Sequence, residues 1–171
     1  MRKKREYIEG AAYHVTSRTN DKIRVFERRL GKKVMLMVLD GAKKKFGFKL
    51  MNFCIMPTHI HLLIMPGPGE NLSKIMQWIK THSSKRWNQL HGSTDHLWGN
   101  RFFERPIKDL RDYLYVMNYI DQNPVKAGLS PRVGEWKESG AYYIQENIKG
   151  LVDYDDFTRR LYARPGLLPA P

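Results

Sequence analysis

Alternation of apolar and polar residues predicts the strands of this chain. Residues 12–18 alternate with the period of two that is typical of a half-buried β-strand. One face carries Tyr13, Val15 and Ser17, and the other carries His14, Thr16 and Arg18. Residues 49–56 and 59–65 are two further strand-like runs, and the short connection Pro57–Thr58 favours an antiparallel hairpin. We expect a fourth strand over residues 101–107.

Three other segments have apolar residues at helical spacing. The first covers residues 27–46 and has a basic exposed end, and the second covers residues 72–90 with Asn71 as its N-cap. The third begins at Asp109. We expect it to end at about Asn123, because the residue before Pro124 is disfavoured in the helical conformation.

The resulting order is β, α, β, β, α, β, α. It predicts an α+β fold, ferredoxin-like or RRM-like, in which a four-stranded antiparallel sheet carries two packed helices and is followed by an additional C-terminal helix that carries Tyr119. A chain of 171 residues suits one domain. We place that domain at residues 1–150, with a C-terminal extension at 151–171 that is partly helical and then a tail rich in Pro and Gly.

The net charge of the chain indicates a candidate nucleic-acid-binding protein. Lys and Arg number 30 against 17 Asp and Glu, which gives a formal net charge of +13 and predicts a polyanionic partner. The basic start Arg2, Lys3, Lys4 and Arg5 suits either a phosphate-binding arm or a solvated tail. Cys54 is the single cysteine, which favours a reducing compartment. No apolar run approaches the ~20 residues of a spanning helix, so we expect a cytoplasmic, nucleoid-associated protein without membrane contact.

The segment His59-Ile60-His61 is the first candidate for chemistry. On a strand both imidazoles emerge on the same face, while Ile60 points into the apolar layer. Two neutral imidazoles can bind a divalent cation and leave coordination positions open. The alternative is a pair of surface or hydrogen-bonded histidines without a metal.

The third predicted helix supplies the second candidate. Tyr119 and Asn123 are four residues apart, so their side chains are neighbours on one helix face. A phenol can attack phosphorus, and an amide oxygen can complete a metal site. Both side chains also have a structural interpretation, in which Tyr119 packs with its hydroxyl bonded and Asn123 caps the helix.

Four segments together resemble the REP-associated tyrosine transposases, which are single-tyrosine HUH transposases acting on single-stranded DNA. They are residues 13–18 (YHVTSR), 56–63 (MPTHIHLL), 97–102 (LWGNRF) and 119–129 (YIDQNPVKAGL). Thr58 is a departure, because the family usually has Asn before the first histidine. Thr58 is not an expected ligand, so this change bears on the hairpin geometry rather than on the metal site.

The resemblance implies a role for each matching residue. His59 and His61 correspond to the paired metal ligands, Asn123 to a polar third ligand and Tyr119 to the nucleophile. The family's metal is Mg2+ or Mn2+, and two imidazoles with an amide make Mn2+ equally reasonable on ligand chemistry. The implied activity is a strand transferase that cuts and rejoins single-stranded DNA near hairpins through a 5′-phosphotyrosine.

The DNA contacts are a separate expectation. Besides the basic arm, we expect Arg18, Trp98 and Arg101 to contact DNA, the last two from a segment flanking the fourth strand. The proton acceptor for Tyr119 is left open between water, His14 and the substrate. Also open are a monomer or a homodimer, and whether Tyr119 serves its own subunit or a partner.

Two other functions remain alternatives. One is a non-catalytic single-stranded nucleic-acid-binding module of the same fold. The other is a metal-dependent hydrolase that uses water, for which Asp109 or Asp112 would be a further ligand. A covalent adduct with single-stranded DNA separates the three, because only the tyrosine transferase forms one.

Overall fold

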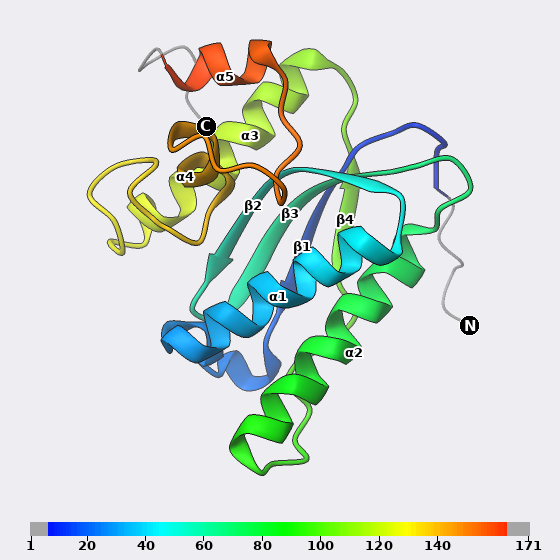
Figure 1. Ribbon diagram of the computed structural model, residues 1–171, viewed down its shortest axis with the longest axis vertical. Coiled ribbons are helices and arrows are strands. Elements are labelled where there is room, and N and C mark those ends of the chain that lie inside the picture. Colours follow the sequence, from blue (N-terminus) through cyan, green and yellow to red (C-terminus); the bar gives the residue numbers. More distant parts are fainter. Residues whose placement is uncertain (1–6, 164–171) are drawn as a thin grey trace.

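Four strands form one antiparallel sheet in the computed structural model, which describes residues 7–163 (Figure 1). They are β1 (Tyr13–Arg18), β2 (Phe48–Met56), β3 (His59–Pro66) and β4 (Phe103–Pro106). The spatial order is β2-β3-β1-β4, and each neighbouring pair is antiparallel. This is the arrangement of a ferredoxin-like sheet, so the predicted fold class is confirmed.

Helices α1 (Arg29–Lys45) and α2 (Leu72–His91) lie side by side across one face of the sheet (Figure 1). The strand residues that face them include Val15, Ile60 and Leu62, all fully buried. Asn71 caps α2 as expected, since its side chain accepts a hydrogen bond from the Lys74 backbone N–H. Burial of apolar residues between the two layers forms the core of the fold.

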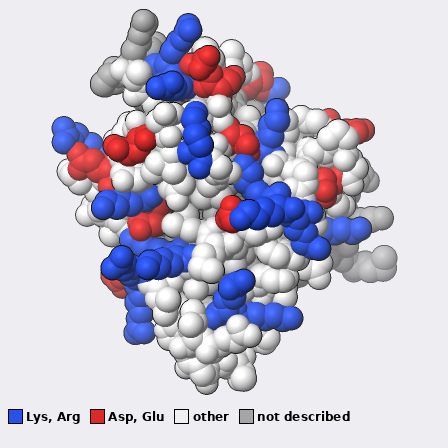
Figure 2. All heavy atoms as spheres, viewed as in Figure 1, with Lys and Arg blue, Asp and Glu red and all other residues white. Residues whose placement is uncertain are grey.

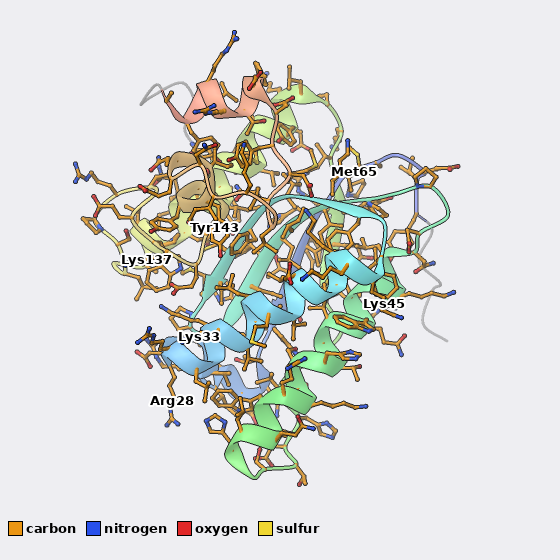
Figure 3. All side chains as sticks on the ribbon, in the orientation of Figure 1. Arg28, Lys33, Lys45, Met65, Lys137 and Tyr143 are labelled. Carbon is orange, nitrogen blue, oxygen red and sulfur yellow. The ribbon has the colours of Figure 1, made fainter. Side chains whose placement is uncertain are left out.

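The exposed side of the two-helix layer is basic. Figure 2 shows Lys and Arg spread over this face with fewer Asp and Glu between them. Lys33 and Lys45 lie near opposite ends of α1 (Figure 3). The net positive charge inferred from composition is therefore displayed on the surface of the folded chain.

Helix α3 (Leu110–Lys126) packs on the other face of the sheet, against β2 and β3. It carries Tyr119, and two shorter helices, α4 (Gly140–Gln145) and α5 (Asp156–Tyr162), follow it within the described residues. Tyr119 thus lies on the third helix rather than on the last one. Because α3 covers the β2 side of the sheet, the side formed by β1 and β4 is left more open.

The expectation that Pro124 ends this helix is wrong. Pro124 lies inside α3, which runs on to Lys126. Because Pro124 is in the last turn, it costs the helix only its own missing N–H bond and does not break a long segment. Gly128, just beyond the end of the helix, caps it: its φ of 67° allows Leu129 N–H to reach the Pro124 carbonyl and Gly128 N–H to reach that of Val125.

The segment after residue 150 is tied to the rest of the fold. Leu151 and Val152 are buried in the common core, and the Asp153 carboxylate accepts hydrogen bonds from Lys43 Nζ and Leu50 N–H. The Tyr162 hydroxyl of α5 donates to Asp121 of α3. The domain boundary between residues 150 and 151 stays a prediction.

Two short 3-10 helices, η1 (Asn20–Lys22) and η2 (Val25–Glu27), connect β1 to α1. The predicted strands and helices occur in the predicted order, with β4 shorter than expected. Within residues 7–163, no helix has the length and apolar character that crossing a bilayer requires.

Candidate active site

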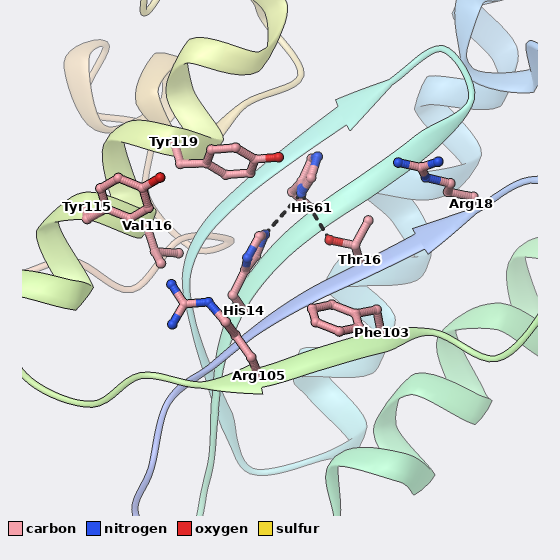
Figure 4. A pocket seen from close by; sticks show the side chains of 9 residues that line it. All are labelled: His14, Thr16, Arg18, His61, Phe103, Arg105, Tyr115, Val116 and Tyr119. Atoms are coloured by element: carbon pink, nitrogen blue, oxygen red, sulfur yellow. Dashed lines mark hydrogen bonds between the residues drawn. The ribbon is translucent and has the colours of Figure 1, made fainter. Parts of the chain in front are cut away.

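His61 on β3 lies close to Tyr119 on α3, and His59 lies beside His61. In the β1–β3 ladder Thr16 is opposite His61 and Arg18 is opposite His59, so these side chains share the face that α1 and α2 leave free. The ring centroids of His61 and Tyr119 are 5.7 Å apart. Strand β3 and helix α3 therefore bring His61 and Tyr119 together within one chain (Figure 4).

A cavity of about 420 Å3 opens between α3 and the β1–β4 side of the sheet. Figure 4 shows its walls, with Tyr115 and Tyr119 from α3 on one side and the strand residues on the other. The lining residues are His14, Thr16, Arg18, His61, Phe103, Arg105, Tyr115, Val116 and Tyr119. Cationic and aromatic side chains, which can bind the phosphate and the base of a nucleotide, both line this cavity.

His61 is held at one ring nitrogen only. Its Nδ1 lies 3.0 Å from His14 Nε2 and 3.2 Å from Thr16 Oγ1. Its Nε2 is buried and has no hydrogen-bond partner. A buried nitrogen without a partner is costly unless it has a ligand, so Nε2 is the natural attachment point for a cation.

His59 is held in the same way. Its Nδ1 lies 3.1 Å from Thr58 Oγ1, and its ring centroid is 4.9 Å from that of His61. Thr58, the residue that departs from the family pattern, therefore contacts His59 directly. The β2–β3 hairpin also forms around Pro57 and Thr58, so the departure leaves the hairpin intact.

The surroundings favour neutral histidines. Burial lowers the pKa of His61 well below its ordinary value, and the neighbouring His14 and His59 add to this effect. Burial and then Arg18 lower the pKa of His59. Burial and then Arg105 lower the pKa of His14 to about 4. Only a neutral imidazole offers a lone pair to a metal, so these histidines could act as metal ligands.

Asn123 completes this group of side chains. Its Nδ2 donates to the Tyr119 carbonyl at 2.6 Å, and its proximity to His61 raises the pKa of that histidine against the effect of burial. No group of three or more His, Cys, Asp or Glu suited to a metal occurs in residues 7–163. The amide oxygen of Asn123 could be a third protein ligand beside His59 and His61.

The expected DNA-contact residues differ in their exposure, and some of them lie outside the described residues. Arg18 is exposed and lines the cavity, and Arg101 is exposed in the segment just before β4. Arg2, Lys3, Lys4 and Arg5 lie outside the described residues.

The expectation that Trp98 contacts DNA is wrong for this structure. Trp98 is only 7% exposed, because it packs in the core with its ring centroid 5.5 Å from that of Phe26. Its indole N–H donates to Ser83 Oγ at 2.8 Å, so its polar edge is also used internally. A ring held in this way cannot stack on a base.

Sequence reasoning missed three residues of the cavity wall. Phe103 on β4 is 63% exposed and Tyr115 on α3 is 42% exposed, so both rings are accessible. Arg105 forms a bidentate ion pair with Asp112, with both N···O distances 2.8 Å. The alternation of residues 101–107 could have indicated that Phe103 and Arg105 share a face, and their register with Thr16 and His14 places that face beside His61.

Comparison with known proteins identifies the family. The family described as "Transposase IS200 like" matches residues 7–123, which is more than half of the chain. The chain belongs to the IS200-like transposase family. A REP-associated tyrosine transposase of Haemophilus influenzae is 30% identical over 122 residues, covering 66% of this chain and 68% of that protein. The one from Escherichia coli is 25% identical over 119 residues, covering 66% of this chain and 65% of that protein.

Solved structures agree with the fold of this IS200-like transposase. A REP-associated tyrosine transposase bound to a REP hairpin superposes with a TM-score of 0.71 at 21% identity, covering 91% of this chain and 92% of that one. A transposase from Deinococcus radiodurans gives 0.51 at 19% identity, covering 71% and 97% respectively. The resemblance to REP-associated tyrosine transposases found in the sequence is thereby confirmed.

Proposed function

We propose that this transposase cuts and rejoins single-stranded DNA near hairpins, with Tyr119 as nucleophile. One observation carries the proposal: the Tyr119 ring lies beside His61, whose buried Nε2 has no partner, at the wall of an open cavity. A phosphodiester in that cavity would meet a phenol on one side and cationic side chains on the other. Nucleophilic attack by a side chain splits the transfer into two reversible steps.

In the first step the Tyr119 oxygen forms a bond to phosphorus as the bond from phosphorus to the 3′ oxygen breaks. The products are a 5′-phosphotyrosine and a DNA end whose 3′ oxygen takes up a proton. In the second step another 3′-hydroxyl attacks the phosphotyrosine, releases Tyr119 and rejoins the strand. The phosphodiester bond energy is retained in the protein–DNA bond, so no external energy source is needed.

The residues present fit a divalent cation. His61 Nε2 is a buried nitrogen without a partner, and His59 and Asn123 lie beside it. His59, His61 and Asn123 would hold Mg2+ or Mn2+. Because Mg2+ prefers oxygen ligands, the two imidazole nitrogens suit Mn2+ better. When bound, the cation would supply Lewis-acid polarisation of a phosphate oxygen.

Tyr119 must also lose its proton. His14 is a poor acceptor, because its Nε2 is already in a hydrogen bond with His61 and its pKa is lowered to about 4. Of the acceptors considered, water and the substrate remain. Both can enter the open cavity next to the phenol.

Hairpin-forming single-stranded DNA is the proposed substrate. The relative of known structure carries a REP hairpin, and this chain has a net charge of +13 and a matching fold. The positive charge would attract the backbone of such DNA, and an unpaired segment would enter the cavity that Arg18 lines.

A covalent-adduct assay tests the proposal. The full chain is incubated with 5′- and 3′-labelled hairpin oligonucleotides carrying unpaired flanks, with Mg2+ or Mn2+, and products are separated on a denaturing gel. We expect a protein–DNA band that carries the 3′ label, because the downstream fragment is bound through its 5′-phosphate. This band should be absent in Tyr119→Phe. Tyr142→Phe, which alters a tyrosine on α4, is the matched control and should keep the band.

Other outcomes separate the alternatives. Cleavage without an adduct would favour a water-using hydrolase, and binding without cleavage would favour a non-catalytic module. An adduct that persists in Tyr119→Phe would refute the nucleophile assignment.

A further inference from the structure

The hydrogen bonding around His61 points to a role for strand β1. His14 and Thr16 are alternate residues of β1, so both side chains emerge on the face that carries His61. His14 Nε2 and Thr16 Oγ1 both lie within hydrogen-bond distance of His61 Nδ1, at 3.0 Å and 3.2 Å. The His14 and His61 rings are also stacked, with centroids 5.2 Å apart and planes inclined by 21°. The His61 ring thus has one defined orientation.

The positions of the ring protons follow from these contacts. A neutral imidazole carries one N–H, on Nδ1 or on Nε2. If Nε2 carried it, this buried N–H would make no hydrogen bond in the structure. If Nδ1 carries it, the proton is donated to His14 Nε2 or Thr16 Oγ1, and the Nε2 lone pair stays free. The second arrangement satisfies the buried groups.

We propose that His14, assisted by Thr16, is a positioning residue that holds His61 as the Nδ1–H tautomer with Nε2 free to bind a cation. The inference rests on the metal-binding role of His61 in the proposed function and adds a specific task for β1. Residues that accept the second N–H of a metal-bound histidine fix both its tautomer and its ring orientation. His14 is 8% exposed and is therefore buried enough to keep this bond free of competing water.

His14 acts through His61 and not as a ligand or base. Its Nε2 faces His61 Nδ1 rather than the unpartnered Nε2, and residues 7–163 contain no set of three His, Cys, Asp or Glu suited to a metal. The sequence pattern explains how it is placed. His14, Thr16 and Arg18 have the same period-two spacing that puts His59 and His61 on one face of β3, so the two strands present matching rows of side chains.

Two measurements test this role, and the first uses the wild-type protein without metal. Long-range 1H–15N NMR correlations distinguish Nδ1–H from Nε2–H histidine, and His61→Gln identifies which ring signals belong to His61. We expect His61 to be the Nδ1–H tautomer. In His14→Leu with Thr16→Val, which removes both acceptors, we expect the Nε2–H form to become populated.

The second measurement is Mn2+ affinity, determined from the free Mn2+ signal in electron paramagnetic resonance. We expect His14→Leu to weaken binding by about 10–100-fold, as is usual when the partner of a metal-bound histidine is removed. His14→Gln should restore most of the affinity, because its side-chain oxygen can accept the Nδ1 proton. His91→Leu, at the exposed end of α2, should bind Mn2+ like the wild type. Circular dichroism confirms that each variant is folded.

The outcomes separate this inference from the proposed function. The inference is wrong if wild-type His61 is the Nε2–H tautomer, if the wild type does not bind Mn2+, or if a folded His14→Leu binds Mn2+ as tightly as the wild type. It is also wrong if His14→Gln is as weak as His14→Leu, since His14 would then act as a ligand or by packing alone. A wild type with the expected tautomer and Mn2+ affinity that forms no DNA adduct refutes the proposed function only.

Discussion

The buried carboxyl group of Asp121 makes a quantitative test of the structure. Asp121 lies on α3 between Tyr119 and Asn123 and is 2% exposed. It accepts hydrogen bonds from Asn52 Nδ2 at 2.9 Å and from the Tyr162 hydroxyl at 2.5 Å. Burial raises the pKa of Asp121 to about 7, against the opposing effect of these two bonds. Asp121→Asn replaces this carboxyl group by an amide of nearly the same shape that cannot ionise.

The direction of the pH effect follows from proton binding. The ordinary pKa of this carboxyl group is 3.8, so in the unfolded chain it loses its proton at lower pH than in the folded chain. Between the two pKa values the folded state binds more protons, and the free energy of unfolding therefore falls as pH rises. Integrated between about pH 5 and about pH 8, the loss contributed by Asp121 is about 2–3 kcal/mol.

Urea unfolding of the wild type and of Asp121→Asn across this pH range measures the effect. The comparison is needed because the lowered pKa values of His14, His59 and His61 act with the opposite sign, and the variant retains all three. The Asn side chain can keep both bonds, accepting from Asn52 and donating to the Tyr162 oxygen. We expect the variant to gain about 2–3 kcal/mol over the wild type as pH rises from about 5 to about 8.

Exposed Asp95 supplies the control, because Asp95→Asn changes a carboxylate that stays in water in both states. Its stability relative to the wild type should not vary with pH in this range. If the difference between Asp121→Asn and the wild type were also constant, Asp121 would be ionised in the folded protein at low pH. The burial argument for this network would then fail.

Three further predictions concern packing and DNA contact. Phe103→Ala should weaken single-stranded DNA binding by about 1–3 kcal/mol, because an exposed ring beside the cavity is lost; fluorescence anisotropy measures this, and an unchanged affinity would contradict it. Trp98→Phe should lower the free energy of unfolding by about 1–3 kcal/mol through loss of the bond to Ser83, with DNA affinity unchanged; reduced affinity at full stability would restore Trp98 as a contact. Gly140→Ala should destabilise the fold by about 1–3 kcal/mol, since its Cβ would lie 2.1 Å from Asn52 Oδ1; thermal unfolding measures this, and a melting temperature equal to that of the wild type would argue against the close approach of α4 to β2.

Periodicity predicted most of the fold because the sheet has one face against two amphipathic helices. Strand β1 is an example, since its alternation predicts which residues face the core and which face His61. The end of α3 could not be predicted from Pro124, because its cost depends on how many helical residues follow, and a glycine-dependent cap lies only four residues later. Local preference is overruled there by the cap and by burial of Pro124.

The candidate site was predictable only in part. The spacing of His59 and His61 and that of Tyr119 and Asn123 predicted two pairs, and the fold brings them together. Trp98 could not be assigned, because a tryptophan beside a strand is equally suited to a core and to a base, and only the contact with Ser83 decides. The exposure of Phe103 likewise depends on β4 being an edge strand, which a single strand pattern does not reveal.

Thr58 connects the sequence departure to the chemistry of the site. The hydroxyl of Thr58 lies beside His59 Nδ1 as His14 and Thr16 lie beside His61 Nδ1, so both histidines are held at the same ring position. An Asn at this position would offer a carbonyl oxygen to the same nitrogen, and both groups can accept an N–H. Thr58 therefore supplies a hydrogen bond to His59 that an Asn side chain is also able to make. Replacing Thr58 by Val, which removes the acceptor and keeps the shape, should weaken Mn2+ binding, whereas Thr58→Asn should not.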